Sequence, residues 1–276
     1  MEKYRTVRAR NTSGSFIKPG ELVDIVEQTP LTLYDRRVFN LLLANAWSQI
    51  EEDMEHHIQK TDLKGSMVGN DRLYDTIGRL MGSRVVVSVK RDGKDYHRSV
   101  GLLEVVDEPI RGDGKVYYQF SRKLRELIAN SHIFARIQKD VMLALSSKYA
   151  LALYEMVEKR GNLSHQWTET FEIERFRDLL GVPKDKLKLY KNFKARALNP
   201  AVKEVNALSD YGVSFTEVKK GRRIEAITIG WYQKSIEERK QAFAELRRSR
   251  TGRKARIDGT VEEVVDFELT ENTFEK

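Results

Sequence analysis

The order of secondary-structure signals between Ser146 and Trp231 constrains the fold most strongly. A helical pattern ("SSKYALALYEMVEKRG") precedes a short strand ("WTETFEI"), a helix that ends at a glycine ("ERFRDLLG") and a further amphipathic helix ("YKNFKARALNPAVKEVN"). The last element, "VSFTEVKKGRRIEAITIGWY", alternates apolar and polar residues on both sides of a basic, glycine-centred tip, which predicts a β-hairpin. Helix, strand, helix, helix and hairpin is the order of a winged-helix domain.

The first half of the chain repeats this order in a looser form. Thr32 and Asp35 have the spacing of an N-cap and its answering acid at the start of "LYDRRVFNLLLANAW", and "NDRLYDTIGRLMG" predicts a second amphipathic helix. Asp92-Gly93 then marks a hairpin turn. We therefore predict an α+β fold of two tandem, pseudo-symmetric winged-helix domains. The predicted segments are a flexible basic arm (1–20), an N-terminal winged-helix domain (21–142), a C-terminal winged-helix domain (143–235), and a C-terminal helix with a loosely attached charged tail (236–276).

The net charge of the 276-residue chain is +8, and it is unevenly spread. Residues 257–276 hold seven acids against one lysine, or −6, so residues 1–256 carry +14. A basic body suits nucleic acid, because lysine and arginine displace counterions condensed on phosphate, although solubility alone also explains such a charge. The chain has no cysteine, no apolar run long enough to cross a membrane and no secretory signal. We therefore expect a cytoplasmic protein.

The residue pattern gives little support to catalysis. Rolling-circle nicking enzymes hold a metal with two histidines separated by one apolar residue on a strand. His56 and His57 are adjacent, so in a strand they would point to opposite faces, and we interpret them as a surface pair at a helix end. "GRLMGS" lacks the lysine and the spacing of a phosphate-binding loop. We therefore expect no catalytic residue, no metal site and no cofactor.

The helix predicted over 190–206 has one apolar face and one face suited to nucleic-acid bases. The apolar stripe consists of Phe193, Ala197, Ala201, Val205 and Leu208. The opposite face carries Asn192, Arg196, Asn199, Lys203 and Asn206. Arginine and asparagine read guanine and adenine edges with paired hydrogen bonds, and lysine suits phosphate. We predict that this face enters the major groove of DNA. The alternative is a polar face that is only solvated.

Both predicted hairpins carry cations at their tips. The second tip has Lys219, Lys220, Arg222 and Arg223 around Gly221, and the first has Lys90, Arg91 and Lys94, diluted by two aspartates. Four cations at one tip repel each other in the free protein, but they suit a wing laid along phosphates or in the minor groove. On the helix over 70–82 we expect Arg72 and Arg79 to face away from the core and to contact DNA.

Several segments resemble iteron-binding plasmid replication initiators. "SSKYALALYEMVEKRG", "FEIERFRDLLGV", "YKNFKARALNPAVKEVN" and "VKKGRR" follow one another as in the C-terminal half of that family, and "LTLYDRRVFNLLLANAW" resembles the helix that opens the first domain. The resemblance implies that the C-terminal domain gives the stronger specific DNA contacts and that the N-terminal domain forms much of a dimer interface. It also matches Lys194 and Arg196 to basic DNA-contacting positions, whereas the helical wheel places Lys194 beside the apolar stripe.

The resemblance also implies a function. Monomers of such initiators bind direct repeats (iterons) in a replication origin and help to open it. Dimers bind an inverted repeat and repress the gene of the initiator itself. We therefore expect as partners double-stranded DNA, a second copy of the chain, and the host replication initiator and helicase, but no membrane. Two alternatives stay open, which are a winged-helix transcriptional repressor without a replication role and a nicking replication enzyme.

Pro200 lies inside the helix that is predicted to enter the groove. A proline within a helix removes one backbone hydrogen bond and disfavours helical geometry at the residue before it. We therefore expect a kink or break at Asn199, with residues 190–198 entering the groove and residues 201–208 anchoring them.

Overall fold

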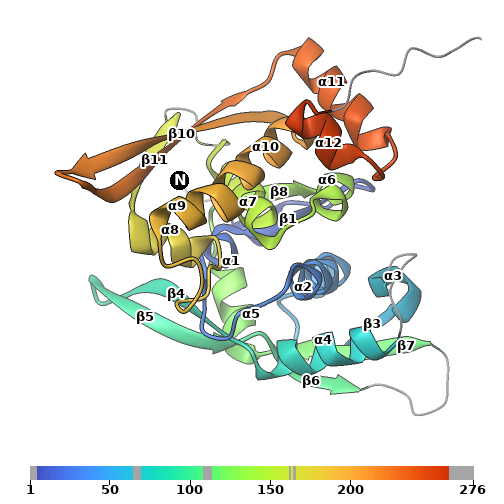
Figure 1. Ribbon diagram of the computed structural model, residues 1–276. Coiled ribbons are helices and arrows are strands. Elements are labelled where there is room, and N and C mark those ends of the chain that lie inside the picture. The colour runs from blue at the N-terminus through green and yellow to red at the C-terminus, as the bar shows by residue number, and fades with distance from the viewer. Residues whose placement is uncertain (1–4, 65–69, 108–113, 162, 164–165, 261–276) are drawn as a thin grey trace, which may run out of the picture.

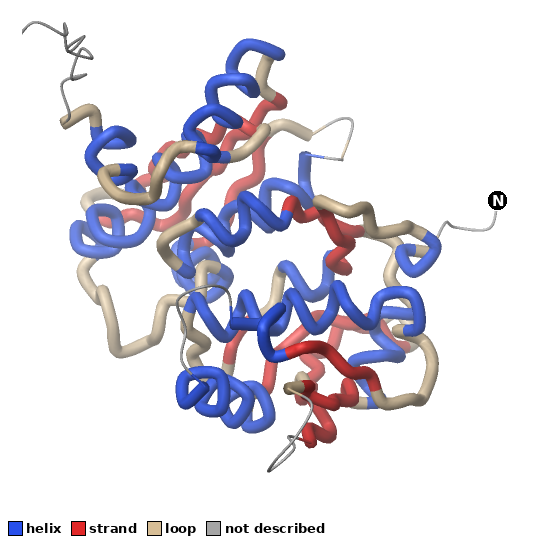
Figure 2. Tube along the Cα trace, turned by 90° about the vertical axis from the view of Figure 1, so that its right-hand side faces the viewer, coloured by secondary structure: helices blue, strands red, loops and turns tan. Residues whose placement is uncertain are grey.

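The computed structural model describes residues 5–64, 70–107, 114–161, 163 and 166–260, which fold into two domains stacked on each other (Figure 1). Figure 2, turned by 90°, shows the same stacking. The N-terminal domain contains a 3-10 turn (Thr6–Arg8), β1 (Ser15–Pro19), α1 (Gly20–Val23), β2 (Val26–Glu27), α2 (Leu33–Ala46), a second 3-10 turn (Trp47–Gln49), β3 (His56–Gln59), α3 (Lys60–Lys64), α4 (Asn70–Gly82), β4 (Arg84–Arg91), β5 (Lys94–Gly101), β6 (Leu103–Asp107), β7 (Lys115–Phe120) and α5 (Arg122–Ala129).

The C-terminal domain contains the helix, strand, helix, helix and hairpin that the sequence predicts. Its elements are β8 (Phe134–Gln138), α6 (Lys139–Ala144), α7 (Lys148–Gly161), β9 (Thr168–Glu172), α8 (Ile173–Leu179), α9 (Tyr190–Phe193), a π-helical turn (Lys194–Leu198), α10 (Asn199–Leu208), β10 (Tyr211–Lys220) and β11 (Arg223–Gln233). Two further helices follow, α11 (Ile236–Arg247) and α12 (Arg253–Asp258).

Each domain has a long hairpin that is joined by one short strand. The strand order is β2-β4-β5 in the N-terminal domain and β10-β11-β9 in the C-terminal domain, and all pairings are antiparallel. A second sheet in the N-terminal domain has the order β3-β7-β6. The two long hairpins point to the same side of the molecule in Figure 1. They are the elements that correspond to the wings of a winged-helix fold.

Helix α2 begins as the sequence predicts. The Thr32 side chain accepts a hydrogen bond from the Asp35 backbone, and the Asp35 carboxylate accepts one from the Thr32 backbone, so each satisfies an amide that the first helical turn leaves unpaired. Burial of Val38, Phe39 and Leu42 then fixes the inner face of the helix. The helix capping and the apolar pattern agree, which explains why this element is readable from sequence.

Residues 5–20 are not a flexible arm, and that prediction is wrong. Strand β1 pairs along its whole length with β8, and all five of its residues are buried. Its side chains alternate between the domains, since Phe16 belongs to the C-terminal core and Ile17 to the N-terminal core. The ribbon of β1 and β8 therefore joins the two domains. Residues on both sides of the predicted boundary at residue 142 pack in the same core as α7, namely Ala135, Ile137, Val141, Met142 and Leu145.

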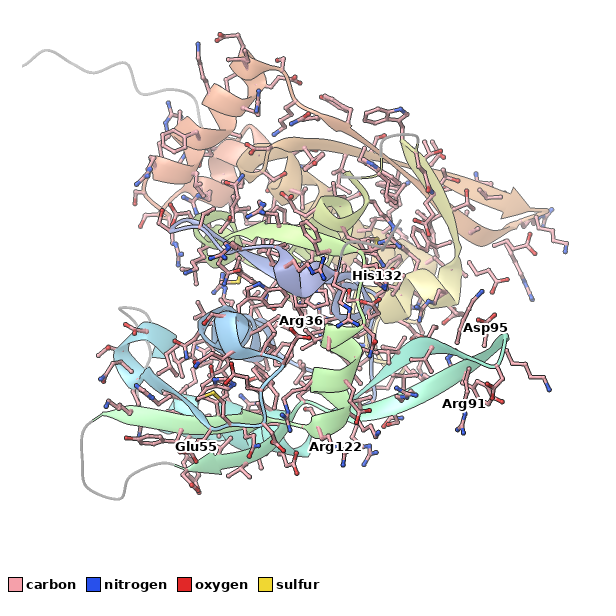
Figure 3. All side chains as sticks on the ribbon, turned by 180° about the vertical axis from the view of Figure 1, so that it is seen from behind. Arg36, Glu55, Arg91, Asp95, Arg122 and His132 are labelled. Atoms are coloured by element: carbon pink, nitrogen blue, oxygen red, sulfur yellow. The ribbon has the colours of Figure 1, made fainter. Side chains whose placement is uncertain are left out.

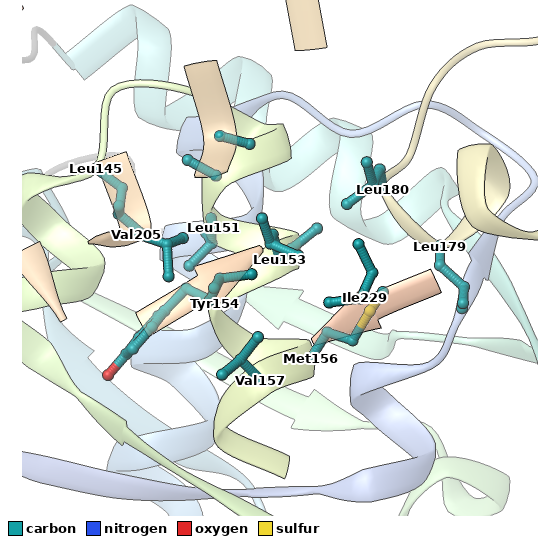
Figure 4. Close-up of a cluster of buried hydrophobic side chains, with 14 of the residues drawn as sticks. Leu145, Leu151, Leu153, Tyr154, Met156, Val157, Leu179, Leu180, Val205 and Ile229 are labelled. Carbon is teal, nitrogen blue, oxygen red and sulfur yellow. The ribbon is translucent and has the colours of Figure 1, made fainter. Parts of the chain in front are cut away.

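The C-terminal core is built around α7. Leu151, Leu153 and Tyr154 are completely buried, and Figure 4 shows them among side chains that include Val205 of α10 and Ile229 of β11. Burial of this cluster, at roughly 1.5–3 kcal/mol for each large apolar side chain removed from water, holds α10 and β11 against α7. Helix α10 and the hairpin are thus fixed relative to each other through α7.

A buried ionic contact ties the domains together. The Lys18 ammonium lies 2.7 Å from a carboxylate oxygen of Glu155, with both side chains at most 5 % exposed. The second oxygen of Glu155 accepts a hydrogen bond from the Asn40 amide of α2 at 2.6 Å. Burial lowers the pKa of Lys18, and the adjacent Glu155 carboxylate opposes that shift. Both Glu155 oxygens are therefore used by groups from the N-terminal half of the chain.

The start of the predicted charged tail is also ordered, contrary to the expectation of loose attachment. Arg253 is buried and donates hydrogen bonds to backbone carbonyls at the end of α11, including that of Leu246 at 3.1 Å. The Arg256 guanidinium binds the Glu245 carboxylate at 2.8 Å. Cations at a helix carboxyl end are favoured because they pair with carbonyls that lack helical partners. Residues 261–276 lie outside the described residues.

Replacing Lys18 with methionine should lower the free energy of unfolding by about 3–5 kcal/mol, because it leaves the buried Glu155 carboxylate without its cation. Lys240→Met is the matched control, since Lys240 pairs with Glu237 while both are exposed, and it should change stability by less than ~0.5 kcal/mol. Urea unfolding of the two variants measures the difference. Equal midpoints would contradict a stabilising role for the buried pair.

Candidate DNA-binding surface

The helix that contains Pro200 is continuous, so of the kink or break predicted at Asn199 the break does not occur. Asn199 has helical dihedral angles (φ −58°, ψ −47°), and its amide donates to the carbonyl of Lys194 five residues back. The chain widens into a π-helical turn over Lys194–Leu198 directly before the proline. A wider turn accommodates a residue that has no amide hydrogen and whose ring crowds the preceding turn. The irregularity therefore precedes Asn199 and leaves the helix intact.

The same π turn keeps the apolar stripe against the core. Phe193, Ala197, Ala201 and Val205 repeat every four residues and are all completely buried. In a regular α-helix a four-residue repeat drifts by about 40° at each step, because a turn takes only 3.6 residues. A local turn with more residues reduces that drift. The opposite face is consequently turned toward solvent at Arg196 and Lys203.

The outward face holds most of the residues that the sequence predicts for DNA. Arg196 and Lys203 are exposed, and Asn192 and Asn199 are half-buried. Within the described part of the chain, Arg196 has no hydrogen bond or ion pair, whereas the Lys203 ammonium lies 2.6 Å from the Asp258 carboxylate of α12. Asn206 is different, because its amide group exchanges two hydrogen bonds with the backbone of Val213 in β10. Its predicted place on the free face is therefore wrong.

Glu217 of β10 joins this helix to the wing beside it. One carboxylate oxygen accepts a hydrogen bond from the Tyr190 hydroxyl at 2.8 Å and lies 2.7 Å from the Lys194 ammonium. These hydrogen bonds hold the pKa of Glu217 below its ordinary value, and the bond from Lys194 contributes more than the bond from Tyr190. Lys194 also lies over the ring of Phe215. Lys194 is half-exposed beside Phe215 and Glu217 of β10, which supports the place beside the apolar stripe that the helical wheel gives it.

The second wing ends in an exposed cationic tip. Lys219, Lys220, Arg222 and Arg223 are all exposed. Lys220 pairs with Arg223 across a two-residue loop, and Gly221 has φ +62°, a value that suits glycine at the first position of such a hairpin. Only Lys220 of the four approaches an acid, Glu225 at 3.4 Å, within the described residues. The tip is therefore free to meet phosphates.

The first wing is built in the same way and carries weaker net charge. Strands β4 and β5 are joined by Asp92 and Gly93, both with positive φ. Lys90, Arg91 and Lys94 are exposed at this end. Figure 3 shows Arg91 and Asp95 close to the end of the hairpin, with their side chains projecting from it. The predicted hairpin turn is confirmed, and the acids dilute its charge as the sequence indicates.

The two arginines predicted on α4 have different surroundings. Arg72 is exposed, with its guanidinium 5.1 Å from the centre of the Tyr34 ring. Arg79 binds both oxygens of Asp35, at 2.8 and 3.0 Å, and Asp35 is fully buried. Thr76 is buried and donates a hydrogen bond to the same carboxylate. Arg79 therefore fastens α4 to α2, and its predicted role in DNA binding is corrected.

Other exposed residues lie on this surface that were not predicted from the sequence. The loop between α8 and α9 exposes Lys184, Lys186 and Lys188, and it leads directly into the outward face of the helix. Leu189 and Tyr74 are each 69 % exposed, at the start of α9 and on α4. The spacing of lysines in "PKDKLKLYK" was the available signal. The exposed apolar residues gave no signal, because only the structure shows which side of the helix they occupy.

The histidine pair lies on a strand, so its predicted place at a helix end is wrong. On β3, His56 is buried beside the Tyr118 ring, and His57 is exposed. The two rings therefore point to opposite faces, as adjacent strand residues must. Within the described residues there is no group of three or more histidine and acidic side chains that could hold a metal ion. None of the described helices is long and apolar enough to span a membrane.

Two domains, each with a polar-faced helix and a basic hairpin, define a tandem winged-helix protein. The chain belongs to the initiator Rep family. Its residues 17–158 match the family model described as initiator replication protein, WH1, and residues 172–231 match initiator Rep protein, WH2. The predicted fold class and family resemblance are thereby confirmed. The two matched ranges stop before α11 and α12.

One solved structure shows the same fold, and a second gives a weaker match. The Pi initiator protein, solved in complex with iteron DNA, is similar with a TM-score of 0.58 at 19 % identity, over 82 % of this chain and 100 % of that one. Domains 2 and 3 of RctB give a TM-score of 0.43 at 10 % identity, over 81 % and 93 % of the two chains. No curated protein matches the chain.

Replacing Arg79 with alanine should destabilise the fold by about 1–3 kcal/mol, because the buried Asp35 carboxylate loses two charged hydrogen bonds. Burial would raise the pKa of Asp35, but hydrogen bonds from Arg79, Thr32 and Thr76 outweigh it and lower that pKa. Because its pKa is lower in the folded state than in the unfolded state, the ionised Asp35 carboxylate stabilises the fold at pH values above the unfolded-state pKa. This stabilisation is lost as the pH falls through the folded-state pKa. The deficit of the variant in chemical unfolding should therefore shrink in acid, and a deficit independent of pH would refute this role.

Proposed function

We propose that the protein binds the repeated sequences (iterons) of a plasmid replication origin and thereby starts replication. The observation that carries the proposal is the junction at Glu217, which fixes the helix of Arg196 beside the four-cation wing. A helix that reads base edges and a wing that grips the adjacent backbone together recognise duplex DNA. Membership of the initiator Rep family supports the replication role, and the similar Pi initiator protein was solved with iteron DNA.

The side chains divide the work by their chemistry. Arg196 and Asn199 are suited to guanine and adenine edges, and Asn192 lies on the same outward face, so we assign base reading to these three. The wing cations are suited to phosphate, since a compact row of positive charge releases counterions without reading sequence. Lys90, Arg91 and Lys94 give the N-terminal domain a second, weaker phosphate grip.

We further propose that the protein forms dimers that repress its own gene and that it recruits the host replication initiator and helicase. The family resemblance supports these roles. We propose that the dimer interface lies in the N-terminal domain, and the edge strand β6 with its partly exposed Val105 supports this. Footprinting on the DNA next to its gene separates the functions, since an initiator protects direct repeats as well as an inverted repeat, whereas a repressor alone protects only its operator.

Arg196→Ala should weaken binding to the cognate repeat by about 1–3 kcal/mol and affect random DNA much less, because the guanidinium is assigned to a base edge. Arg122→Ala is the matched control, as Arg122 is exposed on α5 and pairs with Glu126. Fluorescence anisotropy with cognate and random duplexes provides both affinities. An equal loss on the two duplexes would show that Arg196 contacts phosphate instead.

Replacing Lys219 and Arg222 together with alanine should weaken cognate and random DNA alike. The plot of log affinity against log salt should become shallower by about 2, because each lost phosphate contact removes roughly one released counterion. Titrations between low and physiological salt measure this slope. An unchanged slope would exclude the wing tip from the DNA interface.

A further inference from the structure

Helices α11 and α12 lie beyond the residues that match the family models. They nevertheless pack against the helix of residues 190–208, which carries Arg196 and which we call the recognition helix. Helix α11 starts with a capping box between Ser235 and Glu238 directly after the second wing. Arg253 caps the end of α11, and Arg256 binds Glu245, so α12 is fastened to α11 by two internal arginines. We call residues 236–258 the C-terminal appendage. Its position relative to α10 is therefore fixed by the fold.

The appendage meets α10 on the face that carries the proposed DNA contacts. Lys203 lies on the same side of the helix as Arg196, two turns further along, and its ammonium is 2.6 Å from Asp258 of α12. Lys254 precedes Asp258 by one helical turn, so it shares that side of α12, and it is exposed. Lys203 and Lys254 therefore flank one carboxylate at the end of the outward face.

Helix dimensions place this contact at the wall of the major groove. Seven residues separate Arg196 from Lys203, which corresponds to roughly 10 Å along the helix at 1.5 Å per residue. The major groove of B-DNA is about 12 Å wide. If Arg196 reads a base edge inside the groove, Lys203 and α12 reach the sugar-phosphate backbone that borders it. A cation at that point meets phosphate rather than bases.

The charge of the appendage fits such a neighbour. Residues 247–258 contain six cations and one acid, which gives +5. The fold uses Arg253 and Arg256 internally, and it leaves Arg247, Arg248 and Lys254 exposed. Within the described residues the nearby acids are already engaged, Glu245 by Arg256 and Asp258 by Lys203. The outward charge is therefore strongly positive on an element with a fixed position.

We propose that the C-terminal appendage is an additional DNA-contacting element, in which Lys254 binds a backbone phosphate beside the end of the recognition helix. This inference rests on the proposed function. It assigns to Asp258 a positioning role, because the carboxylate holds α12 against α10 and also neutralises part of the charge of Lys203. The contact is independent of sequence, so the appendage adds affinity without adding specificity.

Lys254→Ala in the full chain tests the proposal. Its affinity for a duplex selected by the protein from random sequence, and for an unselected duplex of equal length, should fall about threefold at physiological salt, and the salt slope should shrink by about 1. Lys240→Ala is the matched control, because Lys240 is an exposed lysine of α11 paired with Glu237.

Wild-type affinity and slope in Lys254→Ala would overturn the proposal, and so would tighter binding, which would mean that the appendage shields the helix. Failure of this inference is distinguishable from failure of the proposed function. If Arg196→Ala loses discrimination while Lys254→Ala behaves as wild type, the initiator function stands and the appendage contact falls. If the wild-type protein does not select any duplex from random DNA, the proposed function fails first.

Discussion

The buried carboxylate of Glu155 sets the arrangement on which everything else depends. Lys18 from β1 and Asn40 from α2 bind its two oxygens, and they belong to the N-terminal half of the chain. An ion pair without access to water is strongly disfavoured unless it is geometrically satisfied, so this contact tolerates little relative motion of the domains. Glu155 with the β1 and β8 ribbon therefore fixes the two domains relative to each other. Such a fixed spacing favours joint binding of the two domains to one duplex, because less conformational freedom is lost on association.

Within the C-terminal domain a second carboxylate has a corresponding role. Glu217 connects Tyr190 and Lys194 at the start of the recognition helix to strand β10 of the wing. A helix and a hairpin that contact DNA gain affinity when their spacing is set before binding, because less conformational freedom is lost on association. The two carboxylates thus act at different levels, one between the domains and one between the elements of a single domain.

The sequence predicted those features that depend on local chemistry. The capping box of α2, the glycine turn at Gly221 and the apolar stripe that begins at Phe193 are each specified by neighbours a few residues apart. Features that depend on distant partners were missed. From the sequence alone, Lys18 is predicted to be one cation of an exposed arm. Its partner Glu155, which accepts a hydrogen bond from its ammonium group, lies 137 residues later. Arg79 reads as a DNA ligand for the same reason, because its partner Asp35 lies 44 residues earlier.

Pro200 shows the limit of a local rule that is correct in itself. The proline does perturb the helix, but the tertiary packing of the four-residue stripe favours a widened turn over a break, so the perturbation appears at Lys194–Leu198. The surroundings of α12 illustrate the converse. Its basic composition suggests an unfolded tail, and the ion pairs of Arg256 and Lys203 with Glu245 and Asp258 fold part of it.

Photo-cross-linking from the two wing tips tests most directly whether the domains present one continuous surface. A photoreactive residue placed at Lys94 or Arg222, which are exposed at the two wing tips and do not have positive φ, should cross-link to one duplex that carries a single selected site. If the domains present one continuous surface, both positions label the same duplex within about two helical turns, roughly 21 base pairs. Labelling from Arg222 with none from Lys94, in a complex of one protein chain and one duplex, would contradict it.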